Sequence, residues 1–151
     1  MTAPFDAAQD LADAPRIGGA QRPKDAATLI LTRGGSRPEV LMGRRAPGHV
    51  FMASKWVFPG GRIDRSDFTA AATGDLPSDV VRRLEGELPA RRARALALTA
   101  VRETFEETGL ILGQAAPSAS VAGPWREYRQ AGALPDLSVL SYIARAITPP
   151  G

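Results

Sequence analysis

Arg102-Glu103-Thr104-Phe105-Glu106-Glu107-Thr108-Gly109-Leu110 is the stretch that decides how the chain folds, and it ends a long run of good helix formers. At about 100° per residue, its three glutamates fall within an arc of roughly 100° on one side of a helix. Leu98, Val101 and Phe105 fall on the opposite side, where they form an apolar stripe. The sequence therefore predicts a helix over residues 90–108 with one core-facing side and one side that carries three carboxylates.

The positions of these three carboxylates are unfavourable for two electrostatic reasons. The carboxylates belong to Glu103, Glu106 and Glu107. Like charges three and four residues apart repel by about 0.2–0.5 kcal/mol per pair in an isolated helix, and the helix dipole disfavours anions in the last turn. Gly109 follows as a residue typical of a helix end. Such a cluster needs open water or a cation, and glutamate oxygens suit a hard divalent ion. For the three glutamates alone, a solvated acidic face is the favoured interpretation.

A second stretch makes a cation site more favourable than a solvated acidic face. It reads Phe58-Pro59-Gly60-Gly61-Arg62-Ile63-Asp64-Arg65-Ser66-Asp67. It reads as a strand end followed by a glycine turn, where a backbone carbonyl can face a ligand. Together the two stretches resemble the signature of the Nudix hydrolase family, which is Gly, five residues, Glu, seven residues, then Arg-Glu-apolar-x-Glu-Glu-x-Gly-apolar. Gly61 matches the first glycine, Asp67 stands at the first glutamate, and Thr104 occupies an apolar position.

The spacing between the two stretches departs from the short signature. Between Asp67 and Arg102 lie 34 residues, and a subset of the family carries an insertion there. Within that subset, the peroxisomal coenzyme A diphosphatase branch has a run similar to the one found here, which consists of Phe51-Met52, Val57 to Gly61, Asp64 and Asp67. The resemblance covers residues 26–112 well and the rest of the chain weakly.

The resemblance implies an α/β (α+β) protein with the Nudix fold, in which helices sandwich a mixed β-sheet. We expect a flexible N-terminal arm at residues 1–24 and a Nudix domain at residues 25–151 with an insertion at about 68–89. Because the fold needs further strands and a closing helix behind the signature helix, we expect its C-terminal part to be missing or to be completed by a partner chain, for example in a homodimer.

The residues outside the signature predict further elements. Runs of apolar or alternating residues predict strands, and Ser78 is expected to cap the helix that follows it. Trp56 is expected to pack in the core rather than to stack on a nucleobase. The strands are expected at residues 26–32, 39–45, 56–58, 110–112 and 139–144, and further helices at residues 79–88 and 125–131.

The resemblance also implies a site and a reaction. Mg²⁺ or Mn²⁺ would bind a group of carboxylates and one backbone carbonyl, and an arginine would orient the carboxylates. The expected metal ligands are Glu103, Glu106, Glu107 and the Gly60 carbonyl. The expected catalytic residues are Arg102, Glu103 and Glu106. The expected substrate-binding residues are Arg44, Arg45, Phe58, Gly61 and Arg62.

The reaction that the resemblance implies is hydrolysis of a pyrophosphate linkage in a nucleoside diphosphate derivative. The best match is coenzyme A or acyl-coenzyme A, because of the insertion and the run that precedes it. ADP-ribose, a dinucleotide and a dinucleoside polyphosphate are alternative substrates. A non-catalytic nucleotide-binding domain is an alternative of a different class.

Composition sets broader bounds. The 151 residues suit one domain, no apolar run approaches the length of a membrane span, and no secretory signal is visible. Cysteine is absent, which excludes disulfides and thiolate chemistry, and by default we expect a cytoplasmic protein. The net charge of +3 fits an anionic small-molecule substrate. Nucleic-acid binding is not expected, because no aromatic residue interleaves the arginines at positions 82, 83, 91, 92 and 94.

Overall fold

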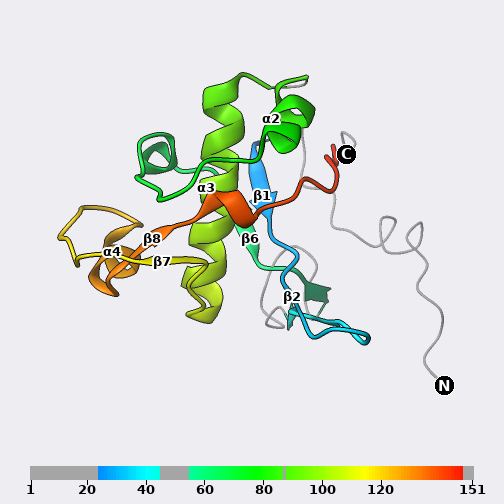
Figure 1. Cartoon of the computed structure of the whole chain (residues 1–151), viewed down its shortest axis with the longest axis horizontal. Coiled ribbons are helices and arrows are strands. Elements are labelled where there is room, and N and C mark those ends of the chain that lie inside the picture. The colour runs from blue at the N-terminus through cyan, green and yellow to red at the C-terminus, as the bar shows by residue number, and fades with distance from the viewer. Residues whose placement is uncertain (1–23, 45–54, 87, 148–151) are drawn as a thin grey trace, which may run out of the picture.

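A computed structural model of the chain describes residues 24–44, 55–86 and 88–147 (Figure 1). The strands are β1 (Ala26–Thr28), β2 (Thr32–Arg33), β3 (Glu39–Val40), β4 (Gly43–Arg44), β5 (Trp56–Val57), β6 (Gly60–Arg62), β7 (Gly113–Ala115) and β8 (Ala133–Pro135). The helices are α2 (Ser78–Glu85), α3 (Ala90–Thr108) and α4 (Arg126–Gln130), with two 3₁₀ turns, η1 (Arg65–Phe68) and η2 (Leu137–Val139).

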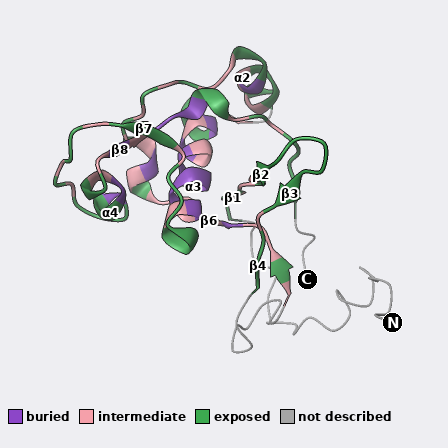
Figure 2. Cartoon of the chain, turned by 60° about the horizontal axis from the view of Figure 1, so that its bottom comes forward, coloured by how far each residue is buried: buried purple, intermediate pink, exposed green. Residues whose placement is uncertain are grey.

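Helix α3 is the element around which the others are arranged. It lies between the β1–β6 pair on one side and β7, β8 and α4 on the other (Figures 1 and 2). Its bounds are those predicted from the sequence. It ends as expected at Gly109, whose left-handed φ of 74° lets its N–H reach the carbonyl of Phe105 at 2.7 Å. The last turn of α3, which carries the glutamates, is thereby fixed.

The strands pair two by two. Four two-stranded antiparallel sheets link β1 with β6, β2 with β3, β4 with β5, and β7 with β8. In the β1–β6 pair, Thr28 lies opposite Gly60 and Ala27 opposite Gly61, which presents the two glycines to α3. The α/β class is confirmed, but in the described part of the chain the strands form short separate pairs rather than one continuous sheet.

The core packs on the side of α3 that faces α4 and β8. Leu98 and Val101 are fully buried there, as the apolar stripe predicts, and they join Trp125, Tyr128 and Leu137 in one cluster. Figure 2 shows this buried side of α3 and the more exposed end of the same helix. The core therefore fixes the rotation of α3, and with it the direction in which the glutamates point.

Two predicted strands are wrong. No strand forms at residues 110–112, because the pairing with β8 begins only at Gly113. No strand forms at residues 139–144 either. Asp136 instead accepts a hydrogen bond from the N–H of Ser138 at 3.0 Å and turns the chain into η2. Val139, the last residue of η2, and Ile143 beyond it lie exposed.

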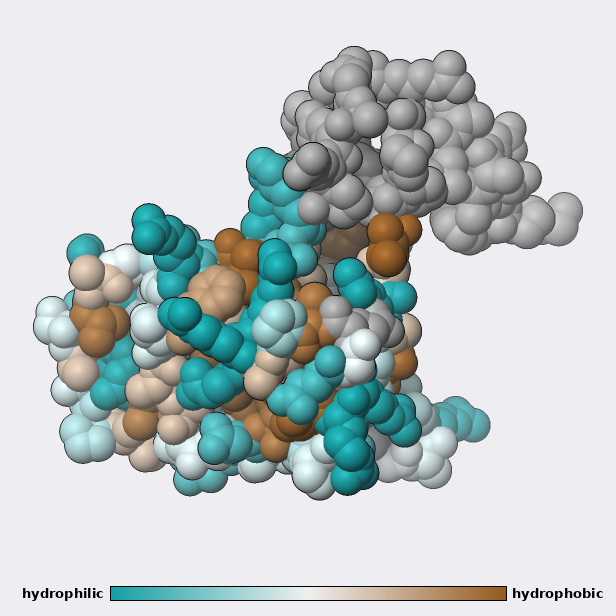
Figure 3. Space-filling model, turned by 90° about the horizontal axis from the view of Figure 1, so that it is seen from above, coloured by the Kyte–Doolittle hydropathy of each residue, from teal (hydrophilic) through white to brown (hydrophobic). Residues whose placement is uncertain are grey.

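Smaller corrections concern α2 and Trp56. Helix α2 follows Pro77 without a side-chain cap, so Ser78 is its first residue rather than its N-cap. Trp56 is 64% exposed on the two-residue strand β5, so the expectation that it packs in the core is wrong. Figure 3 shows other hydrophobic side chains that reach the surface among hydrophilic ones. Among the described residues, no helix has the length and apolar character needed to cross a membrane.

Candidate active site

A buried arginine, Arg102, forms the centre of the site. Its guanidinium makes a two-pronged contact with Asp67, from Nε to Oδ1 and from Nη2 to Oδ2, both at 2.9 Å. Both side chains are almost completely buried, with exposures of 4% and 0%. Burial alone would lower the pKa of Arg102, but Asp67 and the neighbouring glutamates raise it above its usual value. The arginine is therefore a permanent cation at the junction of α3 and η1.

Asp67 is held by more than the arginine. Its Oδ2 also accepts hydrogen bonds from the hydroxyl of Thr99 at 2.8 Å and from the backbone N–H of Asp64 at 2.9 Å. The second bond completes a capping box, since Asp64 in turn caps the first turn of η1. Burial alone would raise the pKa of Asp67, but the hydrogen bonds from Arg102, Asp64 and Thr99 bring it below its usual value. Asp67 is thus a buried, ionised support of α3.

The remaining nitrogen of Arg102 faces the acidic end of α3. Nη1 donates to Glu103 Oε1 at 2.9 Å and to Glu106 Oε2 at 3.1 Å. Nη2 also donates to the backbone carbonyl of Arg62 at 3.1 Å, which ties α3 to the end of β6. One guanidinium thus holds two of the three predicted glutamates and the strand end that lies beside them.

The glycine turn contacts the other sides of the glutamates. The N–H of Gly60 donates to Glu107 Oε2 at 3.3 Å. A Cβ placed on Gly61 would overlap the carboxyl group of Glu103, so only glycine leaves room for that carboxylate against β6. The structure thus brings Glu103, Glu106, Glu107 and the Gly60-Gly61 turn into one place.

Glu106 borders an open cavity of about 300 Å³. The other residues that line it come from the segment before α4 and from its first turn, and they are Gly123, Pro124, Arg126 and Glu127. Burial raises the pKa of Glu106 above its usual value, although the charge of Arg102 opposes part of that shift. The cavity is therefore lined by two carboxylates, those of Glu106 and Glu127, and by the cationic side chain of Arg126.

The type and placement of these residues suit a hard divalent cation, but their present geometry does not yet form a ligand set. Within the described ranges, no three His, Cys, Asp or Glu side chains converge as they would around one ion. One oxygen each of Glu103 and Glu106 is bound to Arg102, and one of Glu107 is bound to Gly60. A cation would find oxygen donors of the right chemistry on one helix face, after the carboxylates turn toward it.

The predicted substrate-binding residues are less closely gathered. Gly61 lies against Glu103, and Arg62 contributes its carbonyl to Arg102 while its side chain is exposed. Phe58 is half-buried between β5 and β6, and Arg44 is exposed on β4, opposite Trp56. Arg45, together with Phe51 and Met52 of the run compared above, lies outside the described residues.

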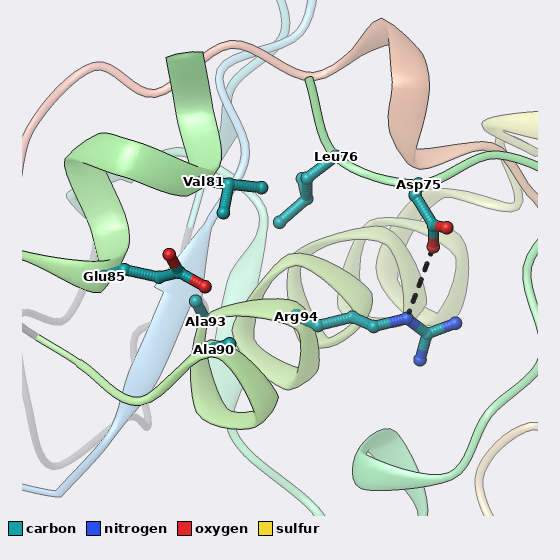
Figure 4. A pocket seen from close by; sticks show the side chains of 7 residues that line it. All are labelled: Asp75, Leu76, Val81, Glu85, Ala90, Ala93 and Arg94. Carbon is teal, nitrogen blue, oxygen red and sulfur yellow. Dashed lines mark ion pairs between the residues drawn. The ribbon is translucent and has the colours of Figure 1, made fainter. Parts of the chain in front are cut away.

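A second cavity, of about 180 Å³, lies between α2 and the first turns of α3 (Figure 4). Leu76, Val81 and Ala93 line it, and Arg94 pairs across its edge with Asp75 at 3.8 Å. Ala93 and Glu106 are separated by 13 residues of α3, which corresponds to about 20 Å along the helix. This second cavity therefore stands apart from the acidic end of α3.

Sequence reasoning missed two side chains of the site, Thr99 and Trp125. Trp125 Nε1 donates to Asp67 Oδ1 at 2.9 Å although 58 residues separate the two in the chain. Thr99 could have been found, because it lies on α3 three residues before Arg102 and thus on the same side of the helix. For Trp125, the sequence offered only its position at the start of the predicted helix at 125–131, and the structure places α4 at Arg126–Gln130.

Comparisons with known proteins bear on the fold. No protein-family model and no curated protein matches this chain. Among solved structures, the crystal structure of a NUDIX hydrolase from Alicyclobacillus acidocaldarius is similar, with 29% sequence identity and a TM-score of 0.54. The match covers 84% of this chain and 64% of that protein, so this chain spans somewhat less than two thirds of its relative's length. The expectation of a Nudix fold is confirmed.

Proposed function

We propose that this chain is a Nudix-type pyrophosphohydrolase that hydrolyses a pyrophosphate linkage in a nucleoside diphosphate derivative with the help of Mg²⁺ or Mn²⁺. The observation that carries the proposal is that Arg102 donates hydrogen bonds to Glu103 and Glu106 next to the Gly60-Gly61 turn. The likeness to a solved NUDIX hydrolase supports it, because the same fold then holds the residues of the signature.

Each residue has a role in this proposal. Glu103, Glu106, Glu107 and the Gly60 carbonyl would hold the cation, which when bound neutralises pyrophosphate charge and lowers the pKa of water. Arg102 keeps Glu103 and Glu106 in place through Nη1. Glu106 is the candidate base, because among the three glutamates it is the one that lines the open cavity.

The substrate would enter the cavity beside Glu106. Arg126 lines that cavity and offers a cation for an anionic group of the substrate. Coenzyme A or acyl-coenzyme A is the proposed substrate, because the sequence before and after the glycine turn is similar to that branch of the family. ADP-ribose, a dinucleotide and a dinucleoside polyphosphate are the alternatives. A cytoplasmic location, a homodimer, the arm at residues 1–24 and the bounds of the insertion stay predictions.

A non-catalytic nucleotide-binding domain is the second candidate. It is favoured by one observation, which is that the three glutamates are held by Arg102 and Gly60 without converging on a common point. This candidate predicts nucleotide binding without turnover.

The test is an assay of phosphoanhydride hydrolysis with and without Mg²⁺ or Mn²⁺. The substrates are coenzyme A, acetyl-coenzyme A, ADP-ribose, NADH and a dinucleoside polyphosphate. Glu106→Gln should lower kcat by on the order of 10²–10⁴-fold if Glu106 is the base, and Glu85→Gln on α2 serves as the matched control. Metal-dependent turnover that Glu106→Gln abolishes and Glu85→Gln retains would support the proposal. Binding of a nucleotide without any turnover would replace it with the binding-domain candidate.

A further inference from the structure

We propose that Trp125 is a positioning residue of this active site, which acts on Glu103 and Glu106 through Asp67 and Arg102. The inference rests on the proposed function, because it assigns a role in holding the residues of the signature. It concerns a contact between two segments that lie 58 residues apart.

The contact is a hydrogen bond to a shared oxygen. Asp67 Oδ1 accepts from Trp125 Nε1 and from Arg102 Nε, both at 2.9 Å. The carboxylate is fully buried, and the indole is 4% exposed. A hydrogen bond to a buried ion is stronger than one between neutral groups, and its loss leaves the charge less well compensated. The indole N–H therefore helps to fix where this oxygen lies.

Packing holds the indole in the orientation that this bond requires. Its ring meets Tyr128 edge-on, with centroids 5.4 Å apart and planes at 67°. Tyr128 meets Phe105 of α3 in the same way, at 4.9 Å and 65°, and donates from its hydroxyl to the Leu112 carbonyl at 2.9 Å. The three rings form a row of edge-to-face contacts against α3, which holds Trp125 in the orientation that faces Asp67.

The geometry of the guanidinium carries this constraint to the glutamates. Asp67 binds Nε and Nη2 of Arg102, and the planar group then leaves Nη1 directed at Glu103 and Glu106. A displaced Asp67 would tilt the guanidinium and change both glutamate bonds together. Trp125 thus sets the position of the two carboxylates without touching either.

The same residue also anchors one wall of the cavity beside Glu106. The residues around it in the chain, Gly123, Pro124, Arg126 and Glu127, line that cavity. The Trp125 side chain points the other way, into the buried carboxylate. The wall that would contact substrate and the arginine that orients the glutamates are therefore fixed by one side chain.

The experiment removes the N–H and keeps the ring. In a Trp56→Phe background, which leaves position 125 as the single tryptophan, Trp125 is replaced by β-(3-benzothienyl)alanine, in which sulfur takes the place of the N–H. The Trp56→Phe protein is the matched control and should equal the native protein in activity. We expect the replacement to lower kcat by roughly tenfold, with KM within about twofold and the thermal unfolding midpoint lowered by several degrees because Asp67 loses one donor.

A second readout needs neither metal nor substrate. In ¹H–¹⁵N spectra, the Arg102 Nε–H resonance should shift when the indole N–H is lost, and the Trp125 Nε1–H resonance should shift in Asp67→Asn. A lower kcat together with these shifts would support the proposal. An Arg102 resonance that stays in place overturns it, whatever the kinetics. If the native chain hydrolyses nothing, the proposed function fails, and the spectra still decide whether Trp125 positions Arg102.

Discussion

Two regions of the described residues, the surroundings of Arg102 and the β2–β5 strands, differ in how far their charged and apolar side chains are buried and paired. Around Arg102, each guanidinium nitrogen has a hydrogen-bond partner and both oxygens of Asp67 accept more than one bond. In the β2–β5 strands, by contrast, the charged side chains are exposed, and Arg33 and Glu39 form an ion pair in solvent. Exposed apolar side chains also occur in this part of the chain, on Val40, Met42 and Trp56.

This difference teaches where the sequence constrains function and stability. A buried network with every partner in place is preorganised, and removal of one member leaves charges without compensation. An exposed pair or an exposed aromatic side chain loses little, because water replaces its contacts. Equivalent substitutions in the two regions should therefore have very unequal effects.

The largest effect is expected from Arg102→Ala, with Arg33→Ala as its matched control. Arg102→Ala should lower the free energy of unfolding by about 3–5 kcal/mol, because Asp67 is left as a buried charge without its partner. Arg33→Ala breaks an ion pair whose side chains are 85% and 67% exposed. This substitution should change the free energy of unfolding by less than about 1 kcal/mol. Urea denaturation followed by circular dichroism measures both values. Similar losses in the two variants would contradict the comparison.

The two adjacent glycines separate an effect on stability from an effect on activity. A Cβ on Gly60 would lie 2.5 Å from the Ala27 carbonyl oxygen, so Gly60→Ala should push β6 from β1 and cost about 1–3 kcal/mol of stability. A Cβ on Gly61 would instead meet the Glu103 carboxyl, the flexible end of a side chain. Gly61→Ala should thus leave the unfolding midpoint nearly unchanged and lower kcat by roughly tenfold or more, because it displaces the Glu103 carboxylate. Equal effects of the two substitutions on both measurements would refute this division.

A smaller effect should appear when the pH is lowered. The pKa of Asp67 is lower in the folded protein than its usual value, because hydrogen bonds from Arg102, Asp64 and Thr99 outweigh the effect of burial. Its stabilising contribution is therefore complete above the pKa of the unfolded chain, near 3.8, and is lost as pH falls through the folded-state value. The difference in unfolding free energy between the native protein and Asp67→Asn should stay constant above about pH 5 and shrink as the pH falls below about 4. A constant difference would show that Asp67 does not titrate with folding.

The elements that the sequence predicted well are those set by local rules. Helix α3 and its end at Gly109 follow from helix formers, an apolar stripe and a residue that tolerates positive φ. Asp67, which stands at the first glutamate of the signature, pairs with Arg102 of the second stretch and so joins the two stretches on which the resemblance rests. Thr104, at an apolar position of the signature, is buried, and its hydroxyl is satisfied there by donating to the Ala100 carbonyl at 2.8 Å.

The elements that the sequence did not predict depend on tertiary pairing. The strands β7 and β8 are three residues long, and their place is decided by their contact with each other rather than by a periodic pattern. The bond from Trp125 to Asp67 depends on which way α4 is turned, and periodicity over five residues cannot fix that. The turn at Asp136 could have been predicted, because Asp64-x-Ser66 and Asp136-x-Ser138 share one capping pattern.

The smallest effect is expected from Trp56→Ser in the β4–β5 pair. Trp56 is 64% exposed, so the loss of its ring should change the free energy of unfolding by no more than about 0.5 kcal/mol. Trp125→Ser is its counterpart in the buried network and should cost about 3–5 kcal/mol, because it leaves a cavity and removes a donor from Asp67. Urea denaturation of both variants checks the contrast. A large loss for Trp56→Ser would contradict the contrast, because the β2–β5 strands would then no longer be the loosely packed side.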